Sequence, residues 1–185
     1  MKKFAALFLA LVMALAGVAA MAEAQQEAQE PVEVNWSDVE PNLEAAGLTG
    51  DFYSYDYYGL QFWIPSEMVQ QTLTDEQKEQ NWVDLYVNDD QSLYMVMEYQ
   101  CWDGSDTLED IAAEVADKAS DTGIIKLNGL DALVIDHGDG ERRQVIIPTD
   151  VQYYYVSFTY TGIDHPEYVS AITASMASIM PITEG

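Results

Sequence analysis

The sequence predicts an α+β domain: a twisted, largely antiparallel sheet that carries two main amphipathic helices on one or both of its faces. Segments rich in aromatic and β-branched residues follow one another across short turns, which joins neighbouring strands in antiparallel fashion. Two further segments place apolar residues at helical spacing, and such stripes must be buried against a sheet. The chain has 185 residues, 49% of them apolar, which suffices for one domain with a core.

The first 22 residues have the layout of a secretory signal peptide. A basic start, Met1-Lys2-Lys3, precedes the uncharged run 4–16, and Ala20-Met21-Ala22 offers small side chains at a cleavage point. Cleavage is expected after Ala22, or alternatively after Ala24. An uncleaved anchor is the competing interpretation, because the apolar stretch could just span a bilayer. We therefore expect a secreted or extracytoplasmic protein with no membrane span once the leader is removed.

Residues 23–50 are expected to form an acidic flexible tether followed by a transitional segment. The run 23–35 holds Glu, Gln and Ala without an aromatic residue, which is typical of a solvated chain. Trp36, Val39 and Leu43 could dock onto the domain. A single α+β domain is expected over residues 51–182.

The first half of this domain is predicted to be mostly β. Gly59 separates two aromatic-rich strands, Thr74-x-x-Gln77 is a capping box, and Asn88 to Gln91 is a turn. The expected elements are strands at 52–58 and 60–64, short helical pieces at 66–71 and 74–80, and a hairpin of strands 82–87 and 92–99.

The second half begins with an amphipathic helix that starts at Thr107 and ends at Gly123. Asn128-Gly129 is a strong signal for a tight hairpin turn. Strands are expected at 124–127, 130–136, 145–147 and 153–160. A closing helix is predicted to be capped by Asp164, with Pro166 in its first turn and Pro181 at its end.

Several of these motifs together resemble a known family. The opening Tyr-Tyr-Gly-Leu-x-Phe-x-Ile-Pro (57–65), the helix start Thr-Leu-Glu-Asp-Ile-Ala (107–112) and the turn Leu-Asn-Gly-Leu-Asp-Ala (127–132) are followed by a Tyr-rich strand and a closing helix. Over residues 51–182 the chain is similar to small exported bacterial proteins of the PsbP-like α/β/α sandwich class. The resemblance implies a fold and a non-enzymatic extracytoplasmic accessory role. It transfers no functional residue, because the motifs are structural.

Composition excludes several functions. Lys and Arg number 7 against 32 Asp and Glu, a formal charge of −25, so nucleic-acid binding and adhesion to an anionic membrane are not expected. A single cysteine, Cys101, rules out a disulfide within the chain, and its setting after an apolar strand predicts a buried thiol.

No catalytic motif stands out, and the protein is not expected to be an enzyme. His137 and His165 are the only histidines, and neither a Gly-x-Ser-x-Gly motif nor a phosphate-binding glycine loop is present. A small hydrolase is the least favoured of three function classes.

The acidic turn around residues 136–141 is a weak candidate for Ca²⁺. Asp136, Asp139 and Glu141 offer carboxylate oxygens close together, although the spacing departs from an EF-hand loop. A solvated hairpin turn explains the same residues, and Arg142 and Arg143 are expected to pair with local acids. No cofactor is otherwise expected.

Tyrosines supply the remaining candidate site. Tyr53, Tyr55 and Tyr57 alternate, as do Tyr153 and Tyr155, so each group would share one face of a strand. Exposed tyrosines favour contacts with proteins or sugars, whereas ordinary packing explains them as well. The leading hypothesis is an exported, non-catalytic binding module for an unknown protein or cell-envelope component. The alternative is a small-ligand or carbohydrate binder that uses the Tyr-rich face.

Overall fold

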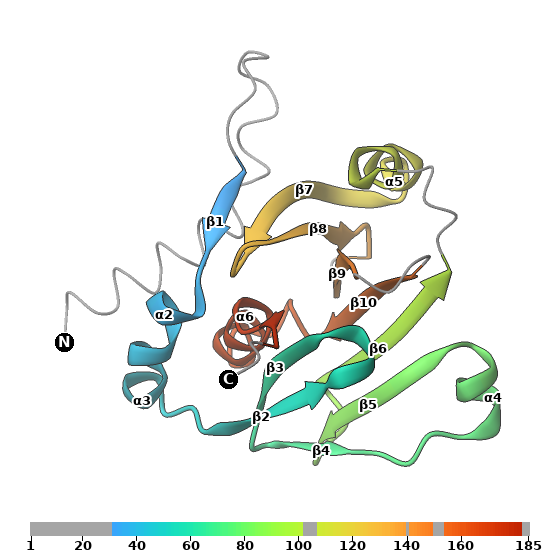
Figure 1. Ribbon diagram of the computed structural model, residues 1–185. Helices are drawn as coiled ribbons and strands as arrows, with labels where there is room; N and C mark the ends of the chain where they lie inside the picture. The colour runs from blue at the N-terminus through green and yellow to red at the C-terminus, as the bar shows by residue number, and fades with distance from the viewer. Residues whose placement is uncertain (1–30, 102–106, 140, 150–153, 183–185) are drawn as a thin grey trace.

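The computed structural model describes residues 31–101, 107–139, 141–149 and 154–182, which form two sheets and several short helices (Figure 1). The large sheet has the strand order β1-β7-β8-β9-β10-β6-β5-β4, and the small sheet has the order β11-β3-β2. The strands are β1 (Val32–Val34), β2 (Gly50–Tyr55), β3 (Leu60–Pro65), β4 (Met68–Gln70), β5 (Trp82–Asn88), β6 (Tyr94–Cys101), β7 (Ala119–Leu127), β8 (Leu130–His137), β9 (Arg142–Pro148), β10 (Tyr154–Thr161) and β11 (Met180–Pro181). The helices are α2 (Trp36–Val39), α3 (Leu43–Ala46), α4 (Asp75–Glu79), α5 (Leu108–Val115) and α6 (Val169–Ala177), with the 3-10 turns η2 (Glu40–Asn42) and η3 (Asp56–Tyr58).

The large sheet is the central layer. Leu133 and Ile135 of β8 point to α5, whereas Ala132 and Val134 point to the opposite face, where α6 and the small sheet pack. Alternate residues of β8 thus belong to two separate apolar clusters, because successive side chains of a strand point to opposite faces of the sheet. The expected α+β fold with helices on both faces of a mainly antiparallel sheet is confirmed, and β1–β7 is the one parallel pair among the described strands.

Both predicted hairpins are present. Asn128 and Gly129 adopt φ values of 50° and 85° between β7 and β8, the left-handed backbone that this turn requires. The turn at 88–91 joins β5 to β6. On β6, Met95 and Met97 lie in the core, as expected from their alternation.

Two of the predicted helix starts are confirmed. Thr107 and Thr74 form reciprocal capping boxes with Asp110 and Gln77. The helix after Thr107 nevertheless stops at Val115, and β7 begins at Ala119 rather than after Gly123. Pairing of β7 with β8 along its whole length supplies tertiary hydrogen bonds that override the local helical pattern.

The closing helix differs from the prediction at its start. It begins at Val169, after two turns closed by the His165 and Tyr168 amides, and the residue at the N-cap position is Tyr168, whose side chain makes no capping hydrogen bond. Asp164 is therefore not a cap. The predicted helical piece at 66–71 is also wrong: Met68 to Gln70 form β4, because β5 offers them a sheet edge.

The segment before Asp51 is more ordered than the expected tether. Val32 to Val34 pair with β7 as β1, and Val34, Trp36 and Val39 are buried in the main core. Docking of Trp36 and Val39, expected as an option, is thus confirmed. These few apolar residues pack because the edge of β7 and the main core lie beside them. The folded part of the chain that the structure describes therefore begins near residue 32.

The signal-peptide prediction, residues 23–30 of the expected tether and the predicted cleavage points lie outside the described residues. Within the described ranges, none of the helices combines the length and apolarity needed to cross a bilayer.

Candidate functional site at the edge of the small sheet

The small sheet is fixed to the large one by aromatic packing. Tyr55 stacks on Phe62 with ring centroids 5.1 Å apart, and Phe62 meets Phe158 of β10 edge-on at 4.9 Å. At the start of β2, a Cβ on Gly50 would lie 2.1 Å from the Ile64 carbonyl oxygen and 2.5 Å from the Trp63 ring. Only glycine permits this close approach of β2 to β3.

A buried carboxylate lies beneath this sheet. Asp84 of β5 is 7% exposed and accepts hydrogen bonds from the Tyr55 hydroxyl at 2.5 Å and from the Gln70 amide at 2.8 and 2.9 Å. Tyr86 is within 2.9 Å of the Tyr55 hydroxyl and 3.4 Å from Asp84. Burial raises the pKa of Tyr55 and of Tyr86 above the usual value for tyrosine, and the Asp84 charge adds to both shifts. The network joins β2, β4 and β5 into one rigid unit.

Three aromatic side chains of β2 and η3 are exposed to solvent. Phe52 is 41% exposed, Tyr53 39% and Tyr57 66%. Phe52 and Tyr53 are partly held by neighbours, since Phe52 meets Trp36 at 5.4 Å and Tyr53 meets Tyr86 at 5.5 Å. Among the ring contacts of the described residues, Tyr57 meets only its chain neighbour Tyr58. These three side chains, here called the edge aromatics, are all reachable from solvent.

Within the described ranges, the outer edge of β2 pairs with no other strand. The Ser66 amide donates to the Thr49 carbonyl at 2.7 Å, so these two residues are a hydrogen-bonded pair. In an antiparallel pair of strands, every second residue bonds to the partner strand and the residues between them direct their backbone groups the other way. In that register Gly50, Phe52 and Ser54 direct their N–H and C=O groups away from β3. Trp63, opposite Phe52, likewise directs its amide away from β2, to the Ser178 hydroxyl at 2.7 Å. Among the described residues β2 has no neighbouring strand on this side.

The structure separates the candidate tyrosines. Tyr53 and Tyr55 face the large sheet, Tyr57 lies in η3 rather than in the strand, and Tyr155 packs in the α5 cluster on the opposite face of the large sheet. Tyr155 also donates to Gln100 of β6. Tyr153 lies outside the described residues. The two groups therefore do not make one surface.

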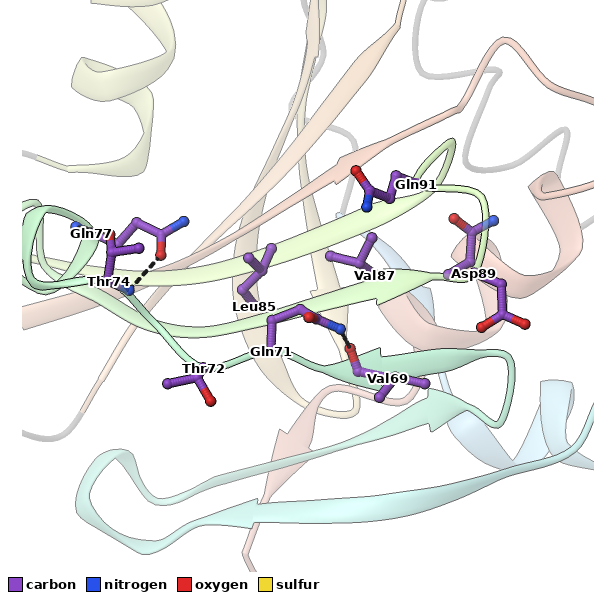
Figure 2. A pocket seen from close by; sticks show the side chains of 10 residues that line it. Val69, Gln71, Thr72, Thr74, Gln77, Leu85, Val87, Asp89 and Gln91 are labelled. Atoms are coloured by element: carbon purple, nitrogen blue, oxygen red, sulfur yellow. Dashed lines mark hydrogen bonds between the residues drawn. The ribbon is translucent and has the colours of Figure 1, made fainter.

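A hollow of about 490 Å³ lies on the outer face of β4 and β5 (Figure 2). Its floor is apolar, formed by Val69, Leu85 and Val87, and its rim is polar. The rim residues are Gln71, Thr72, Thr74, Gln77, Asn88, Asp89 and Gln91. The candidate tyrosines that the structure describes do not line it.

The acids of the turn after β8 form ion pairs with two arginines. Asp136 forms a bidentate ion pair with Arg143, at 2.5 and 2.7 Å, and Asp139 pairs with Arg142 at 2.6 Å. The pKa of the Asp139 carboxyl is lowered, first by the Glu141 amide and then by Arg142. Both arginines pair with local acids, as predicted. No group of three metal-ligating side chains that could hold an ion, at this turn or elsewhere, occurs among the described residues.

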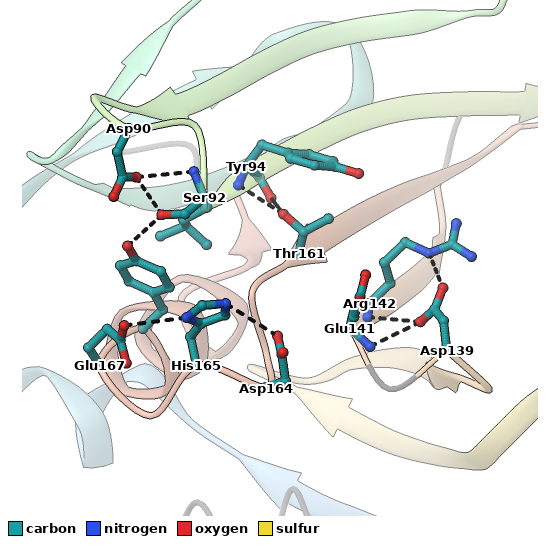
Figure 3. A network of polar contacts seen from close by, with 12 residues as sticks. Asp90, Ser92, Tyr94, Asp139, Glu141, Arg142, Thr161, Asp164, His165 and Glu167 are labelled. Carbon is teal, nitrogen blue, oxygen red and sulfur yellow. Dashed lines mark hydrogen bonds and ion pairs between the residues drawn. The ribbon is translucent and has the colours of Figure 1, made fainter.

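The two histidines make different contacts: the His137 carbonyl accepts from the Ser120 hydroxyl at 3.3 Å, and the His165 ring lies beside acids. The exposed His165 ring lies 3.9 Å from Asp164 and 3.4 Å from Glu167, while the Ser92 hydroxyl contacts Asp90 and, at 2.5 Å, Tyr168 (Figure 3). Hydrogen bonds from Ser92 lower the pKa of Asp90. The expectation that Cys101 is buried is wrong: it lies exposed at the end of β6, where the strand runs out of the core.

Sequence reasoning missed Asp84 and the open strand edge. The alternation of β5 suggested that Val83, Leu85 and Val87 share a face, but a bulge between Trp82 and Asp84 turns Val83 and Asp84 toward the core. The one available signal was an acid inside an apolar strand. Which edge of a strand stays unpaired depends on sheet order, and no local motif encodes it.

Comparisons with known proteins found similar solved structures but no family. No family model and no curated protein matches the chain. Similar solved structures include a cyanobacterial PsbP from Synechocystis, with 12% identity over 72% of this chain and 93% of that chain and a TM-score of 0.48. A Bacteroides thetaiotaomicron protein is 12% identical over 74% of this chain and 50% of that chain, with a TM-score of 0.44. A Pseudomonas aeruginosa protein of unknown function is 16% identical over 73% and 99%, with a TM-score of 0.40. A PsbP is thus among the similar structures, as the motifs predicted, and this similarity concerns the fold alone.

Proposed function

We propose that this protein is an exported, non-catalytic binding module that acts through protein contacts at the edge of its small sheet. The observation that carries the proposal is the open edge of β2 beside the edge aromatics Phe52, Tyr53 and Tyr57. Tyrosine and phenylalanine are enriched at protein interfaces, and partial burial lowers the entropy lost when they bind. The hydrogen bonds of the Asp84 network tie this surface to β5 of the large sheet.

Carbohydrate binding through the tyrosines is less well supported. Tyr53 and Tyr155 lie on different faces of the large sheet, and the Tyr55 hydroxyl is engaged by Asp84. A sugar site needs stacking rings and free polar groups that converge on one place.

Export is tested by the N-terminus of the protein recovered outside the cytoplasm. The expected first residue is Glu23, or Gln25 with the alternative cleavage point, because small residues precede both positions. N-terminal sequencing and intact mass measure it. A product that retains Met1 and stays in the cytoplasmic fraction contradicts the proposal.

Contact through the small sheet is tested by crosslinking and capture of the tagged full chain in its own cells. Tyr57→Lys should reduce the yield of the specific crosslinked partner at least about tenfold, since it puts a charge on the most exposed edge aromatic. Val69→Lys is the matched control, an exposed apolar residue on the outer face of β4. Equal yields from both variants, or equal loss, contradict the assignment of the surface.

A further inference from the structure

We infer that the edge of β2 binds an extended, cationic segment of a partner protein, which adds to the small sheet as a further strand. This inference rests on the proposed function, because it specifies how the same surface binds. In strand addition, main-chain hydrogen bonds supply the affinity and the flanking side chains supply selectivity.

The first observation is the length of the exposed edge. The other edge strands of the two described sheets are short: β1 and β4 have three residues each and β11 has two, while β2 has six. Proteins protect sheet edges with short strands, proline, bulges or charged side chains. β2 contains no proline, and its pairing with β3 has no register shift.

The second observation is that β2 presents outward-facing backbone groups on an exposed strand. Gly50, Phe52 and Ser54 direct their backbone groups outward, and four residues of β2, Asp51 to Ser54, are exposed. The edge aromatics flank this line, and the hydrogen bond from Tyr55 to Asp84 ties β2 to β5. A strand that docks here therefore meets a template that needs little ordering.

The third observation is charge. From residue 31 to 77 the chain carries no Lys, Arg or His, whereas Asp51 begins the exposed line and Asp56 follows it. Four of the five Lys and Arg residues in the described ranges pair with the chain's own acids: Lys78, Lys126, Arg142 and Arg143. A partner segment that carries positive charge would therefore complement this acidic edge.

Charge also argues against two other occupants. A second copy of the chain has the same formal charge of −25 and would bring Asp51 and Asp56 against like charges. The chain's own residues 23–30, Glu-Ala-Gln-Gln-Glu-Ala-Gln-Glu, contain no basic residue. A cationic segment is the occupant that the electrostatics favour.

The test uses three synthetic peptides and the protein in the form that its cell delivers. The probes are acetyl-Lys-Val-Lys-Val-Lys-Val-Lys-amide, the same peptide with Glu for Lys, and the Lys peptide with Pro at its centre. We expect amide NMR shifts and slowed hydrogen exchange at Gly50, Phe52 and Ser54 with the Lys peptide. Binding should be at least about tenfold weaker for the other two peptides, and for the Lys peptide in 0.5 M NaCl.

Variants at one position separate backbone from charge effects. Ser54→Pro removes an outward N–H and should weaken binding of the Lys peptide at least tenfold, whereas Ser54→Thr keeps the N–H and should bind like the wild type. Ser54→Lys keeps the backbone and adds repulsion, so it should also weaken binding if Ser54→Pro misfolds.

Equal affinity for the Lys and Glu peptides, equal affinity of Ser54→Pro and Ser54→Thr, or shifts confined to β4 overturns the inference. Slow hydrogen exchange at the same amides in a dimer without peptide also overturns the inference, because a second copy of the chain then occupies the edge. If the captured partner depends on Tyr57 while the peptides fail to bind, strand addition is wrong and the proposed function stands.

Discussion

Asn128 serves the fold in two ways. Its backbone adopts a φ of 50° in the turn between β7 and β8. Its side chain accepts from the Trp36 amide at 2.7 Å and donates to the carbonyls of Ala177 and Ile179 at 2.8 Å. One residue thus ties the start of α2 and the end of α6 to the same hairpin.

Asn128→Gly isolates the second of these roles. Glycine keeps the left-handed turn but removes three hydrogen bonds, so the free energy of unfolding should fall by about 2 to 4 kcal/mol. Urea denaturation measures the change. Asn81→Gly is the matched control, since Asn81 also has a positive φ of 65° and should change stability by less than about 1 kcal/mol. Equal losses in both variants would mean that the side-chain bonds of Asn128 contribute nothing.

At the scale of elements, the small sheet depends on polar as well as aromatic contacts with the large one. Asp84 has hydrogen-bond donors from β2 and β4 but no cation beside it among the described contacts. The Tyr55 and Tyr86 hydroxyls must therefore stay protonated to keep these polar contacts, and burial raises the pKa of both. Burial also raises the pKa of Tyr160, which lies in the core beside Ser175 of α6.

The predicted consequence is a loss of stability at alkaline pH. A tyrosine in the unfolded chain loses its proton near pH 10, whereas these side chains keep theirs in the folded state. The contribution is thus fully present below about pH 10 and is lost as pH rises toward the folded-state pKa values. Tyr55→Phe, which keeps the ring on Phe62, should lower stability at pH 7 and flatten the decline above pH 10.

Chemical denaturation between pH 7 and pH 11 measures both effects. Tyr57→Phe is the control, because Tyr57 lies outside the Asp84 network, and its profile should follow the wild type. A Tyr55→Phe profile as steep as that of the wild type would show that Tyr55 does not contribute to the alkaline loss.

At the scale of the whole molecule, charge and sheet order act together. The basic residues of the described ranges lie from residue 78 onward and mostly pair with nearby acids, so the first part of the folded chain is uniformly acidic. The order β11-β3-β2 puts the longest open strand edge in that part. Salt should weaken whatever binds there, because exposed charges are screened.

Local patterns determined much of this protein: the turn at Asn128, both capping boxes, the strands β3, β6 and β8, and the acidic charge. These features depend on backbone torsions and hydrogen bonds within a few residues, or on composition alone. Tertiary structure decided the rest, because a strand edge or a buried acid is defined by what lies beside it. Through tertiary contacts, residues 68–70 and 119–123 form strands, and Val34 and Trp36 lie in the core. The same contacts place the candidate tyrosines on different faces, bury Asp84 and leave the edge of β2 open.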